Sequence, residues 1–169
     1  MLQTWFHTFQ EEVNIMTNFL KMAHAISDLG YDVYIFKRFA DGGKDDFIPQ
    51  LSKIRTIFFI NRQTGKIYTC SCCWMPAEKF AFGFAAIEYK VETGQVRYGD
   101  SGYVYWCQED GTLDVSNLKC FLDDMLLDMD EVYGAKDTIG SSLFRTDVFS
   151  TQGIAHIALR LGFKLQYKI

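Results

Sequence analysis

Apolar side chains recur at steps of three and four residues in three parts of the chain, which is the pattern of a helix with one buried stripe. This spacing predicts an N-terminal helix over residues 8–29 and two C-terminal helices over residues 117–133 and 151–161. A glycine follows each segment directly. Because glycine adopts positive φ at little cost, we predict that these residues end the helices: Gly30, Gly134 and Gly162.

Segments rich in β-branched and aromatic residues occupy most of the chain between the helices, and they predict strands. Four of them form two hairpins, each with a Thr-Gly pair in its turn, where glycine suits a tight loop. A fifth segment extends this antiparallel meander. The predicted strands are residues 31–36, 55–61, 66–72, 84–91, 95–102, 103–108 and 164–169.

The order of these elements indicates an α+β fold. We expect a central, mainly antiparallel β-meander of about five to six strands, with the N-terminal helix and the two C-terminal helices packed on one face of it. A length of 169 residues, 49% of them hydrophobic, fits a single globular domain over residues 1–169 with a sizeable core.

The N-terminal sequence MLQTWFHTFQ lacks the basic start and the uninterrupted apolar run of a signal peptide. No apolar stretch approaches the roughly 20 residues that cross a bilayer as a helix. We therefore expect a cytoplasmic protein that has no membrane contact and whose five cysteines remain thiols.

Three of the cysteines lie in the stretch CSCCW, residues 70–74. In a strand, Cys70 and Cys72 point to one face and Cys73 to the other, so the three thiols do not converge. The other two, Cys107 and Cys120, stand alone, whereas structural zinc sites pair two ligand knuckles. We interpret the thiols as strand and core packing and expect neither a metal nor a cofactor.

Histidines and nucleophiles do not form a recognisable catalytic set. The chain has three histidines, none within a known motif, and no Ser or Cys lies in a nucleophile elbow. We therefore expect a protein that is not an enzyme. The alternative is a small enzyme with a dispersed site, for which the available residues are His156, Arg160, Asp147 and the thiols.

The segment AHIALRLGFKL, residues 155–165, resembles the Ala-rich helix, Leu-Gly-Phe and strand that close many GNAT-type acetyltransferases. The resemblance implies acyl transfer from a coenzyme whose pyrophosphate binds an R/Q-x-x-G-x-G/A turn at a helix start. Gly153 and Ala155 match the end of that turn, but Ser150 stands at its Arg/Gln position. The turn and the Leu-Gly-Phe also share one helix here, which departs from the family pattern.

An acidic run, DDMLLDMDE, lies on the second predicted helix and contains no Lys or Arg. Like charges at helical spacing cost a few tenths of a kcal/mol per pair, so helix stability does not require them. The run is either a solvated face or a docking face for a basic partner. We favour docking, as in an immunity protein or antitoxin that occludes the positive cleft of a nuclease-like toxin. The expected partner-binding residues are Asp123, Asp124, Asp128, Asp130 and Glu131.

The charge balance, 17 basic against 21 acidic residues for a net charge of -4, argues against a general nucleic-acid binder. A third hypothesis is nevertheless a nucleic-acid-binding sheet, in which Tyr68, Tyr89 and Tyr98 stack on bases. Basic residues do gather along the meander and could form a pole opposite the acidic helix. They are Lys53, Arg55, Arg62, Lys66, Lys90 and Arg97.

Overall fold

The computed structural model describes residues 9–38, 55–61, 66–75, 79–90, 95–98, 103–137 and 151–169. Within these residues the helices are α1 (Phe9–Asp28), α3 (Leu118–Asp137) and α4 (Thr151–Arg160). The strands are β1 (Asp32–Arg38), β2 (Thr56–Ile60), β3 (Ile67–Met75), β4 (Lys79–Lys90), β5 (Gln95–Tyr98), β6 (Tyr103–Trp106) and β7 (Phe163–Lys168). The predicted α+β class is confirmed. The two Thr-Gly turns lie outside the described residues.

All described strands pair antiparallel in one sheet of order β5-β4-β3-β2-β1-β7. The two predicted hairpins are β2–β3 and β4–β5, so the meander is confirmed. β6 does not continue the meander beyond β5. It pairs with residues 81–84 of β4, while β5 pairs with residues 87–90, so β5 and β6 share one edge of β4. β7 pairs with β1 at the opposite edge.

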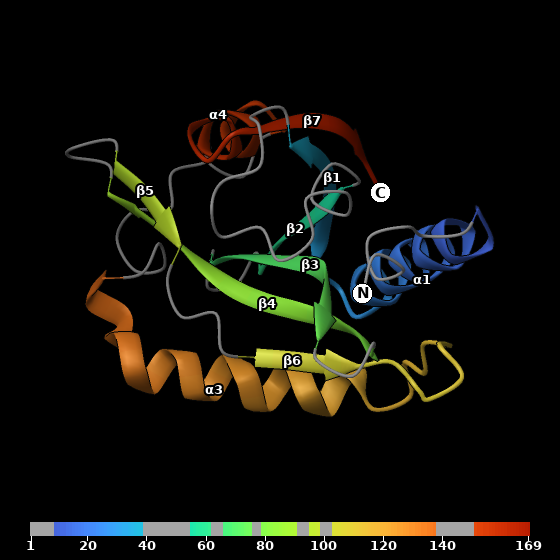
Figure 1. Ribbon diagram of the computed structural model, residues 1–169. Helices are drawn as coiled ribbons and strands as arrows, with labels where there is room; N and C mark the ends of the chain where they lie inside the picture. Colours follow the sequence, from blue (N-terminus) through green and yellow to red (C-terminus); the bar gives the residue numbers. More distant parts are fainter. Residues whose placement is uncertain are drawn as a thin grey trace.

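The helices cover both faces of the sheet, so the expectation of packing on one face was wrong. α1 and α3 bury residues such as Phe19 and Leu122 in a core with Val33, Ile35 and Phe59. α4 packs on the other face, where its buried side chains meet alternate residues of the same strands: Tyr34, Phe36, Phe58 and Ile60. Figure 1 shows α3 along β6 at the bottom of the view and α4 beside β7 at the top. Strands buried on both faces read as continuous apolar runs, as TIFFI does.

The core between the sheet, α1 and α3 is centred on Phe59. Its ring lies 5.3 Å from Tyr31, 5.3 Å from Tyr68 and 6.0 Å from Phe84, measured between ring centroids. Aromatic pairs at such distances add about 0.5–1.5 kcal/mol each beyond the burial of their apolar area. The contacts therefore tie the end of α1 to the middle of the sheet.

Two of the three predicted helix stops are confirmed. Gly30 after α1 has φ +101° and Gly162 after α4 has φ +89°, conformations that other residues adopt only with strain. Gly134 does not end its helix, because α3 continues to Asp137. A glycine inside a helix costs only about 1 kcal/mol relative to alanine, which the good helix formers Ala135 and Lys136 beyond it help to offset.

Candidate functional site

The acidic residues predicted to bind a partner lie on the outward side of α3. The helix buries Leu118, Leu122 and Met125 against the sheet. The helical period then places Asp123, Asp124 and Asp128 on the solvent side, and all three are exposed. Asp130 and Glu131 belong to the same helix, but their side chains are outside the part of the structure that is described.

An exposed leucine lies among these carboxylates. Leu127 comes three residues after Asp124 and four after Asp123, so it is their neighbour on the helix surface. Its side chain is 68% exposed, the highest value among the exposed large hydrophobic residues described. We call the exposed residues Asp123, Asp124, Leu127 and Asp128 the acidic α3 face. An exposed apolar side chain next to carboxylates is the composition of a protein-binding patch with an anchor and a polar rim.

Two of the carboxylates have intramolecular partners that the acidic run did not suggest. Lys119 Nζ lies 2.7 Å from Asp123 Oδ2 in an ion pair one helical turn apart. The hydroxyl of Tyr103 on β6 donates to Asp128. The spacing of Lys119 and Asp123, four residues, is a signal that the sequence carries, whereas the contact of Tyr103 comes from packing alone.

The segment before α3 is fixed to α1, which sets the position of the acidic α3 face. Lys21 Nζ donates to the carbonyl of Leu113 at 2.6 Å, and Asn18 Nδ2 donates to the carbonyl of Gly111 at 2.7 Å. Asp114 accepts from the backbone N–H of Ser116 at 2.9 Å. Hydrogen bonds from Ser116 hold the pKa of Asp114 below its usual value, so this turn is charged at neutral pH.

A small pocket of about 140 Å³ opens at one end of the acidic α3 face. It is lined by Leu29, Tyr31, Lys119, Leu122 and Asp123. The last turn of α1, which ends beside this pocket, carries no basic residue, so the negative end of the helix dipole is not neutralised by one. Burial, and then the charge of Asp123, raise the pKa of Tyr31, so its hydroxyl keeps its proton. The pocket therefore suits a cationic side chain, and Lys119 supplies one from within the chain.

The cysteines lie as the strand alternation predicts where they are described. Cys70 is fully buried in the core beside Tyr68, and Cys72 packs at its margin. Ser71 points to the other face, where its hydroxyl lies 3.1 Å from that of Thr56. Among the described residues, no three His, Cys, Asp or Glu side chains gather as metal ligands.

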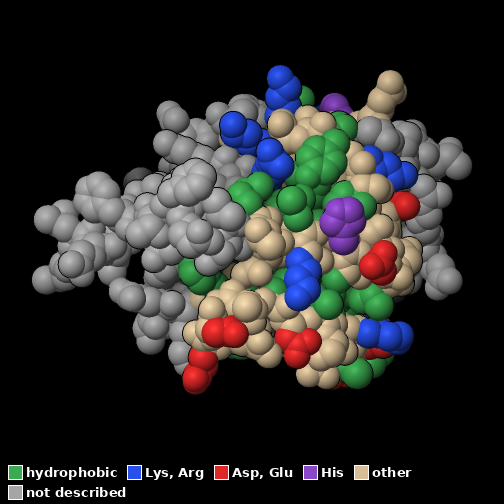
Figure 2. Space-filling view, turned by 90° about the vertical axis from the view of Figure 1, so that its right-hand side faces the viewer, with side chains coloured by type: hydrophobic (Ala, Val, Ile, Leu, Met, Phe, Trp, Pro, Cys, Tyr) green, Lys and Arg blue, Asp and Glu red, His purple; other side chains and the backbone are tan. Residues whose placement is uncertain are grey.

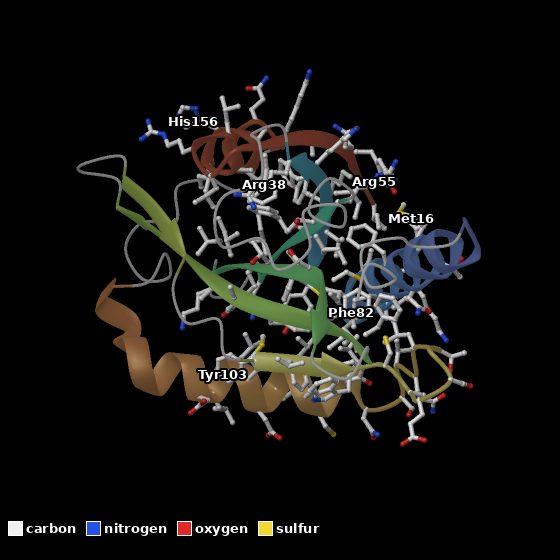
Figure 3. The ribbon with its side chains drawn as sticks, in the orientation of Figure 1. Met16, Arg38, Arg55, Phe82, Tyr103 and His156 are labelled. Carbon is white, nitrogen blue, oxygen red and sulfur yellow. The ribbon has the colours of Figure 1, made fainter. Side chains whose placement is uncertain are left out.

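Among the residues considered for the enzyme alternative, those that the structure describes do not bring a thiol to His156 and Arg160. His156 is exposed on α4 with Nε2 3.5 Å from Arg160 Nη2, and it points away from the body of the protein (Figure 3). Asp147 lies outside the described residues. Cys70 is buried on the sheet face opposite α4.

Two of the residues suggested for nucleic acid binding are buried. Tyr68 is 2% exposed, so it cannot stack on a base, and Lys66 is buried as well. Burial lowers the pKa of Lys66. Arg55 is partly exposed at the start of β2. The remaining residues of both sets have side chains outside the described part of the chain: Lys53, Arg62, Tyr89, Lys90, Arg97 and Tyr98.

Comparisons with protein-family models, with curated proteins and with solved structures find no significant match for this chain. None of the helices described has the length and apolar character needed to cross a membrane. The proposals below therefore rest on the surface chemistry of the described residues.

Proposed function

We propose that the protein binds a basic protein partner through the acidic α3 face. The observation that carries this proposal is the exposed Leu127 on the same outward side of α3 as the exposed carboxylates of Asp123, Asp124 and Asp128. Charges at the rim of an interface accelerate association with a basic surface, and a desolvated apolar anchor slows dissociation. An immunity protein or antitoxin that covers the positive cleft of a nuclease-like toxin is the form of this function that the acidic surface fits best.

The pocket beside the face supports a specific contact with such a partner. Asp123, the phenol of Tyr31 and the end of α1 offer one cationic side chain a carboxylate, an aromatic ring and a negative helix end. Lys119 occupies this environment in the free protein through its ion pair with Asp123. An arginine of the partner would replace it, because guanidinium forms two parallel hydrogen bonds with a carboxylate.

The test is affinity purification of the tagged protein from its native host at low and moderate salt, followed by mass spectrometry. A single basic protein, retained in stoichiometric amount and released by salt, is the expected result. Retention of that protein should fall with Asp124→Lys and with Leu127→Ala. Glu109→Lys, an identical charge change at an exposed residue of the loop before α3, is the matched control.

Association and dissociation rates, measured with the purified protein and its partner, then separate the contribution of the charges from that of Leu127. Asp124→Lys should slow association about three- to tenfold at low salt, and the effect should shrink as salt rises. Leu127→Ala should accelerate dissociation about fivefold or more. Equal losses from Asp124→Lys and Glu109→Lys would mean that net charge and not the acidic α3 face governs binding. An unchanged complex in all three variants would refute the proposal.

A further inference from the structure

A second charged surface lies at the β7 edge of the sheet. Lys37 of β1 is directly opposite Lys164 of β7 in the strand register. On its other side, Phe36 pairs with Thr56 of β2, so Arg55, one residue earlier, comes beside Lys37. Side chains of directly opposite residues point to the same sheet face. Three cations from three neighbouring strands therefore form a row across that face.

An aromatic side chain completes this surface. Tyr167 pairs with Ile35, two residues before Lys37, and so shares its face of the sheet. The guanidinium carbon of Arg55 lies 6.0 Å from the centroid of the Tyr167 ring, which is 39% exposed as a residue. We call Lys37, Arg55, Lys164 and Tyr167 the basic edge.

The three strands of the basic edge carry further positive charge and little negative charge. Around β7, on the other sheet face, Arg38 lies over Phe163 and Lys168 over Tyr34. Within β1, β2 and β7, the acidic residue is Asp32, at the far end of β1, whereas α1, which packs on the same sheet face as the basic edge, carries Glu11, Glu12 and Asp28. Figure 2 shows the Lys and Arg side chains mainly in the upper part of this side of the molecule and the Asp and Glu side chains mainly in the lower part. Figure 3 places Arg55 in the upper part as well, far from Tyr103.

Sheet stability does not require this arrangement, because like charges directly opposite each other destabilise a strand pair. A row of cations next to an exposed aromatic ring matches a chain of phosphates that carries flat bases. An acidic peptide would satisfy the cations but would gain little from Tyr167, since the negative face of the ring does not attract carboxylates. A duplex keeps its bases stacked, so Tyr167 could not stack on them.

We propose that the basic edge binds single-stranded nucleic acid, with Lys37, Arg55 and Lys164 on successive phosphates and Tyr167 stacked on a base. The net charge of -4 does not oppose this proposal, because it averages over the acidic α3 face and a positive edge that lies apart from it. A screening length of about 8–10 Å at ordinary salt separates the two fields. This inference is independent of the protein-binding function proposed above.

The test is fluorescence anisotropy of a fluorescein-labelled single-stranded oligothymidine titrated with the whole chain. We expect a Kd of about 100 µM or tighter at about 50 mM salt, within the range of non-specific binding. Three phosphate contacts predict a slope of log K against log salt of about -2, which weakens binding about 20-fold between about 50 and 200 mM salt. Lys37→Gln with Lys164→Gln should reduce the slope to about -0.7.

Tyr167→Leu should weaken binding about fivefold or more without changing the salt slope, because stacking releases no counterions. Lys119→Gln removes a charge from α3 and is the matched control, so its binding should equal that of the wild type. The double glutamine variant should keep or slightly raise its unfolding temperature, since it relieves a repulsion between β1 and β7.

Three results would overturn the proposal. The first is the absence of oligothymidine binding by the wild type at about 50 mM salt up to about 1 mM protein. The second is binding that the double glutamine variant leaves unchanged. The third is a polyglutamate peptide that binds more tightly than oligothymidine through the same lysines and without Tyr167, which would assign the basic edge to an acidic protein.

Discussion

The described cysteines differ in exposure, and Cys70 and Cys120 are the two extremes. Cys70 is fully buried in the core of the sheet, and Cys120 is exposed on α3 next to the acidic α3 face. A thiol must reach solvent and ionise before it reacts, so these two residues differ in reactivity although neither forms a disulfide. The reactivity of the thiols in CSCCW therefore depends more on which face of β3 each one points to than on how many there are.

We expect N-ethylmaleimide to modify Cys120 in the native protein and to modify Cys70 only when the protein unfolds. Peptide mass spectrometry of samples quenched at intervals measures both rates. The ratio of the rates should fall to about one in denaturant, which is the control for intrinsic reactivity. Modification of Cys70 as fast as Cys120 under native conditions would contradict the burial of β3.

The proposed function makes Lys119 a competitor for the pocket beside Asp123, so its removal should have an effect opposite to that of removing Asp123. Lys119→Gln leaves Asp123 unpaired at the surface and should strengthen binding of an arginine-rich peptide by severalfold. Asp123→Asn should weaken it by a similar factor. Isothermal titration calorimetry at low salt measures both affinities, and a loss of affinity with Lys119→Gln would exclude the competition.

At the scale of elements, the position of α4 is the main departure from expectation. Its apolar stripe is present in the sequence, and it predicted a helix at these residues. That stripe does not indicate which face of the sheet the helix covers, because β1 and β2 are apolar on both faces. Ile154, Ile157 and Ala158 pack on the face that α1 and α3 leave open.

Two substitutions in α4 test this packing. Ile157 is 1% exposed, whereas Leu159, two residues later, is 54% exposed. Ile157→Ala should lower the free energy of unfolding by about 2–5 kcal/mol through lost burial and the remaining cavity, and Leu159→Ala by less than about 1 kcal/mol. Urea denaturation followed by circular dichroism measures the difference. Equal effects would mean that α4 does not present this stripe to the sheet.

At the scale of the whole molecule, the burial of tyrosine side chains makes the free energy of unfolding depend on pH in the alkaline range. The core between the sheet, α1 and α3 holds Tyr31, Tyr68 and Tyr105, and burial raises the pKa of each phenol above its ordinary value of 10.0. Below pH 10 the folded and unfolded chains both keep these protons. Above it the unfolded chain releases them first, so rising pH favours unfolding.

Tyr68 is the most strongly affected of the three, since burial and then the neighbouring Tyr31 raise its pKa. We expect the free energy of unfolding to fall between about pH 10 and pH 11, with Tyr68 contributing up to about 1.4 kcal/mol per pH unit. Tyr68→Phe should reduce this slope. Guanidinium denaturation at several pH values measures the slopes, and identical slopes for Tyr68→Phe and the wild type would contradict the assignment.

The sequence by itself determined the features that depend on local backbone geometry. Helical periodicity located α1, α3 and α4, and the alternation of β3 placed Cys70 and Cys72 on one face, because both periods arise within a single element. It also placed Asp123, Asp124 and Asp128 on the solvent side of α3 for the same reason. The stop at Gly134 failed because a glycine is compatible with a helix as well as with its end.

Only the tertiary structure decided what depends on contacts between distant segments. It assigned α4 to the second face of the sheet, placed β6 on the same edge of β4 as β5 and buried Tyr68 and Lys66. The basic edge joins Lys37, Arg55 and Lys164, which share no local pattern and meet only through the pairing of β1 with β2 and β7. Periodicity reports which side of an element is buried, but the partner that buries it is chosen by long-range packing.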